Sequence, residues 1–594
     1  MRDVVFGLSL SYGEGVQTSV AINNKGRIIE VHKPQGDKKL QYHTAELRQM
    51  DVLWGSSREY DEGVNPSIAL NDHDLVVEIH KAQFWHDLWY HVGQVNGDKV
   101  DWGPSQKFNS GDLPSVALTN DNWCVEVHKS QGNAGLWYHV GNVDQKTKAI
   151  AWGDSRKYDD GDEPKVAMNN KGVIVEVHKS AGLSTLWYHV GIIEKSNKTI
   201  NWGPSHQYDN GVQPSVAITD DGFVIEVHKS QSVGTLYRHV GVINVDNKVI
   251  EWSASEDYDT GSNPSVAVTF NGSMAIQTHQ SELSSNLWFS TSLVIDRMRW
   301  MESQYDTLRT KPLWQVTLPG SHDSGAYNMG TERVHSSCFD APEWLPGSAT
   351  RLFATAHNQD IAGQLQNGCR FFDLRPYYKD EKFYAYHDVL GANFEDMLDD
   401  VADFLNNTSR ELVILKVSHF CSYNFTDTET KKDTKTHEKL VGLIKKKLGD
   451  KMYANMSANL LTTSIGEFVG QGSKVIVWYD DHYIEGMQGF WREISIFDSY
   501  SDTDECCKME CDQLKKMIKR SGSSNKLFLL SWTLTFKDLN SLTKGASLQT
   551  IAAKANRGLG RFLAEYADDC QVNVLYVDFL RDARVTDCAI ILNR

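Results

Sequence analysis

The stretch LPGSHDSG, from Leu318 to Gly325, decides how the C-terminal half folds. An apolar run over 314–318 leads into it and predicts a short buried strand, which Pro319-Gly320 ends sharply. His322 and Asp323 then follow on the loop just past the strand end. In a barrel of parallel strands this edge carries the chemistry, so the pair is a candidate for catalysis as well as for simple loop hydrogen bonding.

Three later stretches place further polar residues at predicted strand ends. GCRFFDLRPYY (368–378) puts Asp373 and Arg375 on one face, because residues two apart in a strand point to the same side. FYAYHDVLG (383–391) brings His387 to the end of a third strand, and ELVILKVSH (411–419) brings Lys416 to the end of a fourth. Two imidazoles can serve as base and acid near neutral pH, and the two cations would stabilise charge growing on a phosphate.

As a set, PGSHDS, RFFDLR and the following YHD resemble the X-type catalytic domain of phosphatidylinositol-specific phospholipase C, over about 298–594. The resemblance implies an α/β domain with a distorted TIM-type (β/α) barrel. It also implies cleavage of phosphatidylinositol, or of a glycosylphosphatidylinositol, at a membrane surface to diacylglycerol and inositol 1,2-cyclic phosphate. Apolar runs at 474–481, 526–535 and 572–580, alternating with helical patterns at 394–407, 435–449 and 548–566, agree with such a barrel.

The subtype follows from two positions. The animal calcium-dependent enzymes have asparagine after the first histidine and acidic metal ligands on the second strand. Here Asp323 follows His322, and Arg375 stands where a calcium ligand would stand. The chain therefore resembles the bacterial-type, metal-independent enzymes, and we expect neither a metal ion nor another cofactor.

The resemblance assigns a role to each candidate residue. His322, oriented by Asp578 at the end of a late strand, would be the base, and His387, paired with Asp323, would be the acid. Arg375, held by Asp373 and backed by Lys416, would stabilise charge on the phosphate. Two strand-end aromatics are expected to contact the substrate, Tyr479 and Trp532, although the family's second arginine after the fifth strand has no counterpart in VIVWYDD. Two further aromatics on predicted loops would touch the membrane or pack internally, Trp344 and Trp491.

The N-terminal half repeats itself. PSVAI or a close variant recurs at intervals of about 50 residues, followed each time by a strand like VEVHK, then in most repeats by LWYHVG and WGxSxxYDxG. Four strand-like segments per repeat predict a six-bladed β-propeller over 1–297. The last repeat lacks its fourth segment, and the chain start (4–15) is expected to supply it and so close the last blade.

The repeated aromatics and histidines allow two interpretations. They fill the space between blades, or they form repeated pockets that bind a glycan or another surface ligand several times. The propeller resembles lectin-like propellers loosely, without an assignable family. One histidine per blade argues against a metal site.

Composition narrows the function classes. The 594 residues carry a formal net charge of -17, which argues against a nucleic-acid partner, and we expect a monomer. Eight of the nine cysteines follow residue 330, which favours disulfides and a secreted, extracellular protein, whereas the chain start lacks a signal peptide and favours a cytoplasmic one. Two alternatives to the lipase stay open: a catalytically silent, lectin- or toxin-like surface-binding protein, and a metal-dependent phosphodiesterase on the same barrel.

Overall fold

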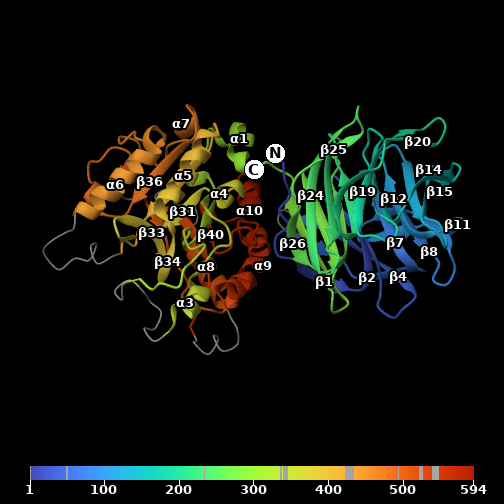
Figure 1. Ribbon diagram of the computed structural model, residues 1–594, viewed down its shortest axis with the longest axis horizontal. Helices are drawn as coiled ribbons and strands as arrows, with labels where there is room; N and C mark the ends of the chain where they lie inside the picture. The colour runs from blue at the N-terminus through green and yellow to red at the C-terminus, as the bar shows by residue number, and fades with distance from the viewer. Residues whose placement is uncertain are drawn as a thin grey trace. The chain divides into compact units, whose positions relative to one another are not determined.

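The computed structural model describes residues 2–48, 51–232, 234–334, 338, 345–421, 434–492, 494–520, 526–537 and 547–594. Contacts divide the chain into two compact units, Asp3–Ile295 and Asp296–Arg594. Figure 1 shows strands throughout the first unit and mixed helices and strands in the second. No helix in the described ranges is long and apolar enough to cross a membrane.

The first unit is an all-β, propeller-like array of antiparallel sheets, six of them among the described residues. The innermost strand of each sheet comes from the PSVAI segment, and each contacts the innermost strands of the two neighbouring sheets. These strands are β2 (Val16–Ile22), β7 (Val64–Leu70), β12 (Asp112–Leu118), β17 (Asp162–Met168), β22 (Val212–Ile218) and β27 (Ser262–Val268).

The outer strands follow the same order in every repeat. The VEVHK segments form β3 (Arg27–Lys33), β8 (Leu75–Lys81), β13 (Trp123–Lys129), β18 (Val173–Lys179), β23 (Phe223–Lys229) and β28 (Met274–Gln280). The next strands are β4 (Lys39–Arg48), β9 (Asp87–Asn96), β14 (Gly135–Asp144), β19 (Thr185–Glu194), β24 (Thr235–Asn244) and β29 (Asn286–Leu293).

The predicted fourth segment is two short strands rather than one. Both strands pair antiparallel with the third strand of their sheet, one after the other along its length, as β5 and β6 do with β4. They are β5 (Asp51–Trp54) and β6 (Arg58–Glu62), β10 (Lys99–Trp102) and β11 (Gln106–Ser110), β15 (Ala149–Trp152) and β16 (Arg156–Asp160), β20 (Thr199–Trp202) and β21 (His206–Asn210), and β25 (Val249–Trp252) and β26 (Glu256–Thr260). In the sixth sheet the chain start, β1 (Leu10–Glu14), pairs with β29.

The hydrophobic core of this unit lies between neighbouring sheets. Val31 and Tyr42 of the first sheet pack with Ile68 and Val76 of the second in one buried cluster. We call each interface between two neighbouring sheets a seam. The repeated tryptophans pack in these seams: Trp102 stacks on Tyr60 of the preceding sheet with ring centroids 5.3 Å apart. Burial of these rings is what fixes the spacing between sheets.

The second unit contains a curled parallel sheet of the kind expected from the sequence. Its order is β37-β36-β35-β31-β30-β40-β39-β38, and every neighbouring pair is parallel. The strands are β30 (Leu318–Ser321), β31 (Phe371–Leu374), β35 (Leu412–Val417), β36 (Lys474–Tyr479), β37 (Phe490–Trp491), β38 (Ile496–Phe497), β39 (Leu527–Trp532) and β40 (Val574–Val577). No ladder between described residues joins the edge strands β37 and β38.

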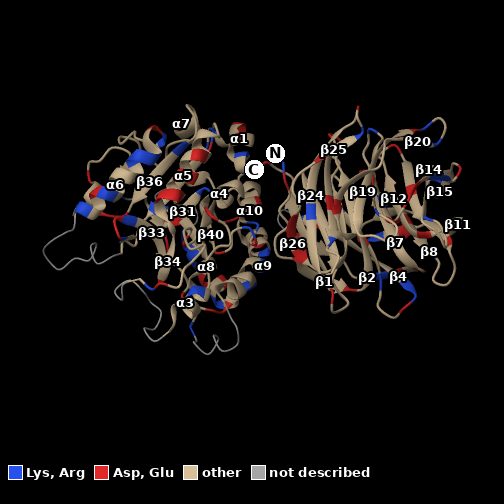
Figure 2. Ribbon diagram, in the orientation of Figure 1, with Lys and Arg blue, Asp and Glu red and all other residues tan. Residues whose placement is uncertain are grey.

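Helices connect and cover these strands. They are α1 (Trp300–Ser303), α2 (Tyr305–Leu308), α3 (Gly347–Ala354), α4 (Ile361–Gln366), α5 (Phe394–Asn406), α6 (Thr434–Leu448), α7 (Ile465–Val469), α8 (Cys506–Arg520), α9 (Leu548–Tyr566) and α10 (Val585–Leu592), with short 3-10 turns η1 (Arg297–Arg299), η2 (Leu313–Gln315), η4 (Gly449–Lys451) and η5 (His482–Ile484). In Figure 2 basic residues recur along α6, and its last turn carries three lysines, which complement the negative end of the helix dipole.

Two strand predictions in this unit were wrong in detail. In the apolar run at 314–318, Trp314 and Gln315 belong to the turn η2, and only Leu318 belongs to a strand. That strand, β30, includes Pro319 and Gly320 instead of ending there. Gly320 lies so close to β40 that a Cβ atom would sit 2.5 Å from Val574 Cγ1, so the glycine permits the strand contact. His387 ends β33 (Lys382–His387), which belongs to a small antiparallel sheet with β32 (Pro376–Lys379) and β34 (Val389–Asn393), not to the parallel sheet.

Candidate active site

The first histidine of the site lies on the loop after β30. His322 Nδ1 donates to Asp578 Oδ1 at 2.8 Å, just past the end of β40, and this contact leaves Nε2 as the free ring nitrogen. Nε2 lies 3.2 Å from Arg375 Nη2 and 3.4 Å from Asp323 Oδ2. A guanidinium can only donate, so Nε2 accepts from Arg375 when the His322 ring is neutral. This is the tautomer that a general base needs.

Two carboxylates control the charge of His322. Burial alone would lower the pKa of His322, but Asp323 and Asp578 outweigh burial and raise that pKa to about 9, with Arg375 opposing the rise. Burial would also raise the pKa of Asp323, but Arg375 and the two histidines hold it below its usual range. Asp323 is therefore a carboxylate at neutral pH.

Arg375 lies between Asp323 and Asp373. Its Nε forms an ion pair with Asp323 Oδ1, and its Nη2 is 3.0 Å from Asp373 Oδ2. Burial of Asp373 would raise its pKa, yet Arg375 and then Lys416 lower it strongly. Tyr576 of β40 donates its hydroxyl to the same Asp373 oxygen at 2.7 Å. The guanidinium is therefore fixed from two sides beside the free nitrogen of His322.

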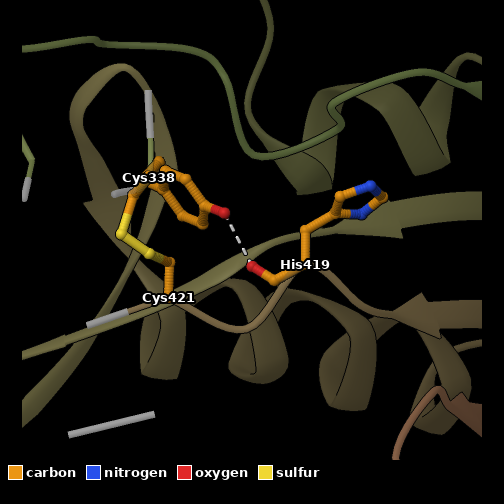
Figure 3. The surroundings of a disulfide bond; sticks show 4 residues. Cys338, His419 and Cys421 are labelled. Carbon is orange, nitrogen blue, oxygen red and sulfur yellow. Dashed lines mark hydrogen bonds between the residues drawn. A yellow bond between two sulfur atoms is a disulfide. The ribbon is translucent and has the colours of Figure 1, made fainter. Parts of the chain in front are cut away.

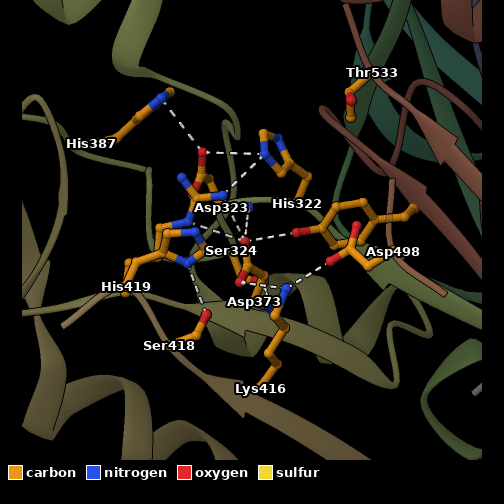
Figure 4. A network of polar contacts seen from close by, with 12 residues as sticks. His322, Asp323, Ser324, Asp373, His387, Lys416, Ser418, His419, Asp498 and Thr533 are labelled. Carbon is orange, nitrogen blue, oxygen red and sulfur yellow. Dashed lines mark hydrogen bonds and ion pairs between the residues drawn. The ribbon is translucent and has the colours of Figure 1, made fainter. Parts of the chain in front are cut away.

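The second histidine approaches from the small antiparallel sheet. His387 Nδ1 donates to Ala354 O at 3.0 Å, so Nε2 is the nitrogen that can exchange a proton, and it lies 3.5 Å from Asp323 Oδ2. Asp323 thus stands between the two histidines (Figure 4). The side chains of His322 and His387 are 23% and 26% exposed, whereas that of Asp323 is 1% exposed, so solvent reaches the imidazoles but hardly reaches the carboxylate between them.

Lys416 lies at the same strand edge. Its Nζ donates to Asp498 Oδ2 at 2.8 Å and is 4.0 Å from Asp373 Oδ1. Burial would lower the pKa of Lys416, but Asp373 and Asp498 raise it, so the amine is charged at neutral pH. The seven residues expected to carry catalysis or hold the phosphate group therefore meet at the carboxyl ends of β30, β31, β35 and β40, joined by His387 from β33.

The two aromatics expected to contact the substrate are not in this group. Tyr479 is fully buried, and its hydroxyl is 2.6 Å from His437 Nδ1. Trp532 is buried against α9, and its indole donates to Ala555 O at 2.8 Å. Of the membrane-rim pair, Trp491 is not at the surface: its ring is buried and its indole donates to Tyr453 O at 3.2 Å. Trp344 lies outside the described residues.

Several residues at the site gave no signal in the sequence. Asp498 and Tyr576 follow no recognisable motif, and His357 Nε2 donates to His322 O at 2.7 Å, which fixes the loop after β30. His419 ends the stretch quoted for Lys416 and could have been found there. It has a left-handed backbone (φ 52°), and its carbonyl accepts the Tyr386 hydroxyl at 2.7 Å beside the Cys338–Cys421 disulfide (Figure 3).

Comparison with known proteins shows which family the C-terminal half resembles. The model of the "Phosphatidylinositol-specific phospholipase C, X domain" matches residues 347–465, a range that contains Asp373, Arg375, His387 and Lys416 but not His322 or Asp578. The C-terminal half resembles the phosphatidylinositol-specific phospholipase C X-domain family. The resemblance stated from PGSHDS and RFFDLR is thereby confirmed.

Three proteins similar to this chain carry the same domain name or a related one. A PI-PLC X domain-containing protein of Dictyostelium discoideum is 27% identical over 132 residues, which are 22% of this chain and 23% of that protein. PI-PLC X domain-containing protein 3 of Danio rerio is 24% identical over 50% of this chain and 92% of its own length. The phosphatidylinositol-specific phospholipase C of Listeria monocytogenes is a structural neighbour with a TM-score of 0.38 and 18% identity, covering 50% of this chain and 99% of that one.

Proposed function

We propose that the C-terminal unit cleaves phosphatidylinositol, or a glycosylphosphatidylinositol, to diacylglycerol and inositol 1,2-cyclic phosphate. The observation that carries the proposal is the placement of two imidazole Nε2 atoms on either side of Asp323, with the Arg375 guanidinium beside one of them. That arrangement supplies a base, an acid and a fixed positive charge within one group of side chains.

The reaction would run by acid–base catalysis. His322 Nε2 takes the proton of the inositol 2-hydroxyl, and that oxygen attacks the neighbouring phosphorus. The bond from phosphorus to the diacylglycerol oxygen breaks as His387 Nε2–H protonates the leaving oxygen. Arg375, with Lys416 behind it, neutralises charge on the non-bridging oxygens. Attack by an internal hydroxyl needs no bound water as nucleophile.

Metal independence is part of the proposal. His322, Asp323 and Asp373 offer ligand atoms close enough together for an ion, which is the observation in favour of a metal-dependent phosphodiesterase. Arg375 already pairs with both of these carboxylates, so an ion there would have to displace a permanent cation.

Release of inositol phosphates from vesicles of phosphatidylinositol or of a glycosylphosphatidylinositol, with and without excess chelator, tests both the activity and its metal independence. We expect chelator to leave turnover unchanged and His322→Ala or His387→Ala to reduce it by roughly 10²–10⁴. His482→Ala, at an exposed histidine outside the group, is the matched control. Loss of turnover with chelator and its recovery with calcium would favour the metal-dependent alternative. No turnover on either lipid would favour a catalytically silent protein.

For the N-terminal unit we propose a six-bladed propeller that directs the enzyme to a glycan-bearing surface. A cavity of about 570 Å³ beside the half-buried Trp137 supports this, because Asn133, Lys157 and Asp160 line it with polar groups next to an aromatic face. Trp137→Ala should weaken binding on a glycan array, whereas Leu53→Ala, at an exposed side chain on β5, should not. Equal glycan binding by the wild type, Trp137→Ala and Leu53→Ala would contradict the proposal.

We also propose a secreted monomer. The Cys338–Cys421 disulfide supports an oxidising compartment, although Cys369, Cys506, Cys507, Cys511, Cys570 and Cys588 are free thiols. Thiol titration with and without reductant, together with light scattering of the purified protein, tests these two points. A reduced Cys338–Cys421 pair in protein isolated from its native source would favour the cytoplasm.

A further inference from the structure

The N-terminal unit encloses a cavity of about 340 Å³ that is lined by residues from all six innermost strands. The repeats place equivalent residues around it, so each position can be compared with five counterparts. At the position of the serine in PSVAI, five repeats have serine and one has lysine: Ser19, Ser67, Ser115, Lys165, Ser215 and Ser265.

The five serines share one structural task. Each hydroxyl oxygen accepts a backbone N–H from the next sheet, at 3.1–3.3 Å, as Ser67 Oγ does from Val116 N. Because the oxygen is used as an acceptor, the hydroxyl hydrogen remains to be donated, and no protein acceptor for it occurs within the described residues. The cavity wall therefore offers hydroxyl donors.

Lys165 departs from this pattern at a cost. In the seam that follows Lys165, Val216 is the residue equivalent to Val116. Its backbone N–H has no serine oxygen to donate to, because lysine replaces the serine. The ammonium group of Lys165 makes no ion pair or hydrogen bond within the described part of the chain. Burial lowers its pKa, and the charge of Glu163 offsets this only in part. An amine without a hydrogen-bond partner in a polar cavity and a lost seam contact both oppose folding, so a ligand for the amine would account for the lysine.

The nearby acid, Glu163, raises the pKa of Lys165 through its charge but forms no ion pair with it among the described residues. Glu163 Oε2 accepts a hydrogen bond from Gln213 N at 2.5 Å. In the following repeat, Gln213 Oε1 accepts the equivalent hydrogen bond from Asn263 N. Its other oxygen lies 3.6 Å from Lys179 Nζ. Glu163 is therefore already engaged by a backbone donor and another lysine.

We propose that this central cavity binds a phosphate-type oxyanion through the Lys165 ammonium and the ring of serine hydroxyls. One cation with several donors spread around a ring matches an anion that presents oxygens in several directions, which a phosphate or sulfate group does and a carboxylate or chloride does not. The proposal does not depend on the activity of the C-terminal unit.

The test is titration of the full chain with sodium phosphate, sulfate, acetate or chloride at matched ionic strength, followed by calorimetry and thermal unfolding. Lys165→Ser restores the residue of the other five repeats. It should raise the unfolding temperature without anion and weaken phosphate binding at least about tenfold. Lys165→Met, which keeps the length of the side chain, should weaken binding equally.

Glu163→Gln provides the second readout, because glutamine occupies the equivalent positions 17 and 213. Removing this negative charge should tighten phosphate binding, an effect that phosphate bound in the other unit could not produce. Equal phosphate binding by wild type and Lys165→Ser would overturn the proposal. Stabilisation by acetate or chloride as strong as that by phosphate would overturn the oxyanion assignment.

Discussion

At the scale of single residues, His322 depends on two carboxylates of very different origin. Asp323 is its neighbour in the chain, whereas Asp578 is 256 residues away and arrives only because β40 pairs with β30. Both raise the pKa of His322, but only Asp578 also fixes the ring tautomer, because it accepts the Nδ1 proton. The two contributions can therefore be separated by mutation.

The pH profile of kcat/KM should report the raised pKa of His322. The base must be neutral, so activity should rise as pH rises through this pKa, with an acidic limb above the ordinary value of about 6.5. Asp578→Asn removes one of the two negative charges and should move the limb to lower pH by about 1 unit, while lowering the plateau. An unchanged limb would show that His322 is not the base.

His419 should contribute to headgroup binding. Its left-handed backbone is held by the Tyr386 hydroxyl, and burial followed by Arg375 lowers its pKa, so its ring is neutral at pH 7. Strain of this kind concentrates at functional sites. His419→Asn keeps a residue that tolerates the backbone and should raise KM roughly 2- to 10-fold with little change in kcat.

Tyr386→Phe removes the bond to the His419 carbonyl but leaves its ring, so it should produce a smaller rise in KM than His419→Asn. Equal kinetics of wild type and His419→Asn would mean that the strained backbone serves only the local fold.

At the scale of elements, the site depends on a buried ion pair that joins the starts of two strands. Arg370 precedes β31 and Glu411 precedes β35, and both side chains are fully buried with Nη2 and Oε2 2.7 Å apart. The guanidinium also donates to Met298 O and Cys369 O. This set of bonds fixes the alignment of the strands that carry Asp373 and Lys416.

Arg370→Met should destabilise the C-terminal unit by about 3–5 kcal/mol, because it leaves the buried Glu411 carboxylate without a cation, although Glu302 N still donates to it. Chemical denaturation measures this loss. Arg410→Met, at the exposed arginine beside Glu411, should cost less than about 1 kcal/mol. The double variant Arg370→Met/Glu411→Leu should recover part of the loss, and a double variant as unstable as the single one would contradict the ion-pair explanation.

At the scale of the whole molecule, the seams of the N-terminal unit repeat one buried polar group. Two histidines of one sheet face an aspartate of the preceding sheet, as His178 and His189 face Asp159 at 3.7 and 2.7 Å. Burial would raise the pKa of Asp159, but His189 lowers it to about 2. Burial would lower the pKa of His189, but Asp159 raises it. The histidines are therefore structural groups of the seams.

These pKa shifts predict that the stability of the N-terminal unit has an optimum in pH. The lowered pKa of Asp159 and Asp209 gives stability that is present above about pH 4 and lost as pH falls towards 2. The raised pKa of His189 and His239 gives stability that is present below about pH 6.5 and lost as pH rises through the folded value. Thermal unfolding of the N-terminal unit should peak between these limits.

Asp159→Asn should flatten this optimum, whereas Asp154→Asn, at a side chain that is 89% exposed, should leave it unchanged. A pH profile that is the same in all three proteins would show that the seams do not control stability.

The sequence by itself determined the local pattern of both units. The 50-residue repeat predicted the strands of the N-terminal sheets, and the apolar runs predicted β36, β39, β40, α5, α6 and α9 within a few residues. Motifs at strand ends predicted His322, Asp323, Asp373, Arg375 and Lys416, because the carboxyl ends of parallel strands meet at one edge. The same kind of motif predicted His387, which reaches this edge from the antiparallel strand β33.

The tertiary structure alone decided which strand-end side chains face that edge. Tyr479 and Trp532 also end strands, but curling of the sheet turns them into the packing against His437 and α9. Asp498 and Tyr576 join the site because β38 and β40 bring them beside Lys416 and Asp373. Alternation along a strand gives two faces but not which face is the interior, since that depends on the helices that cover the sheet.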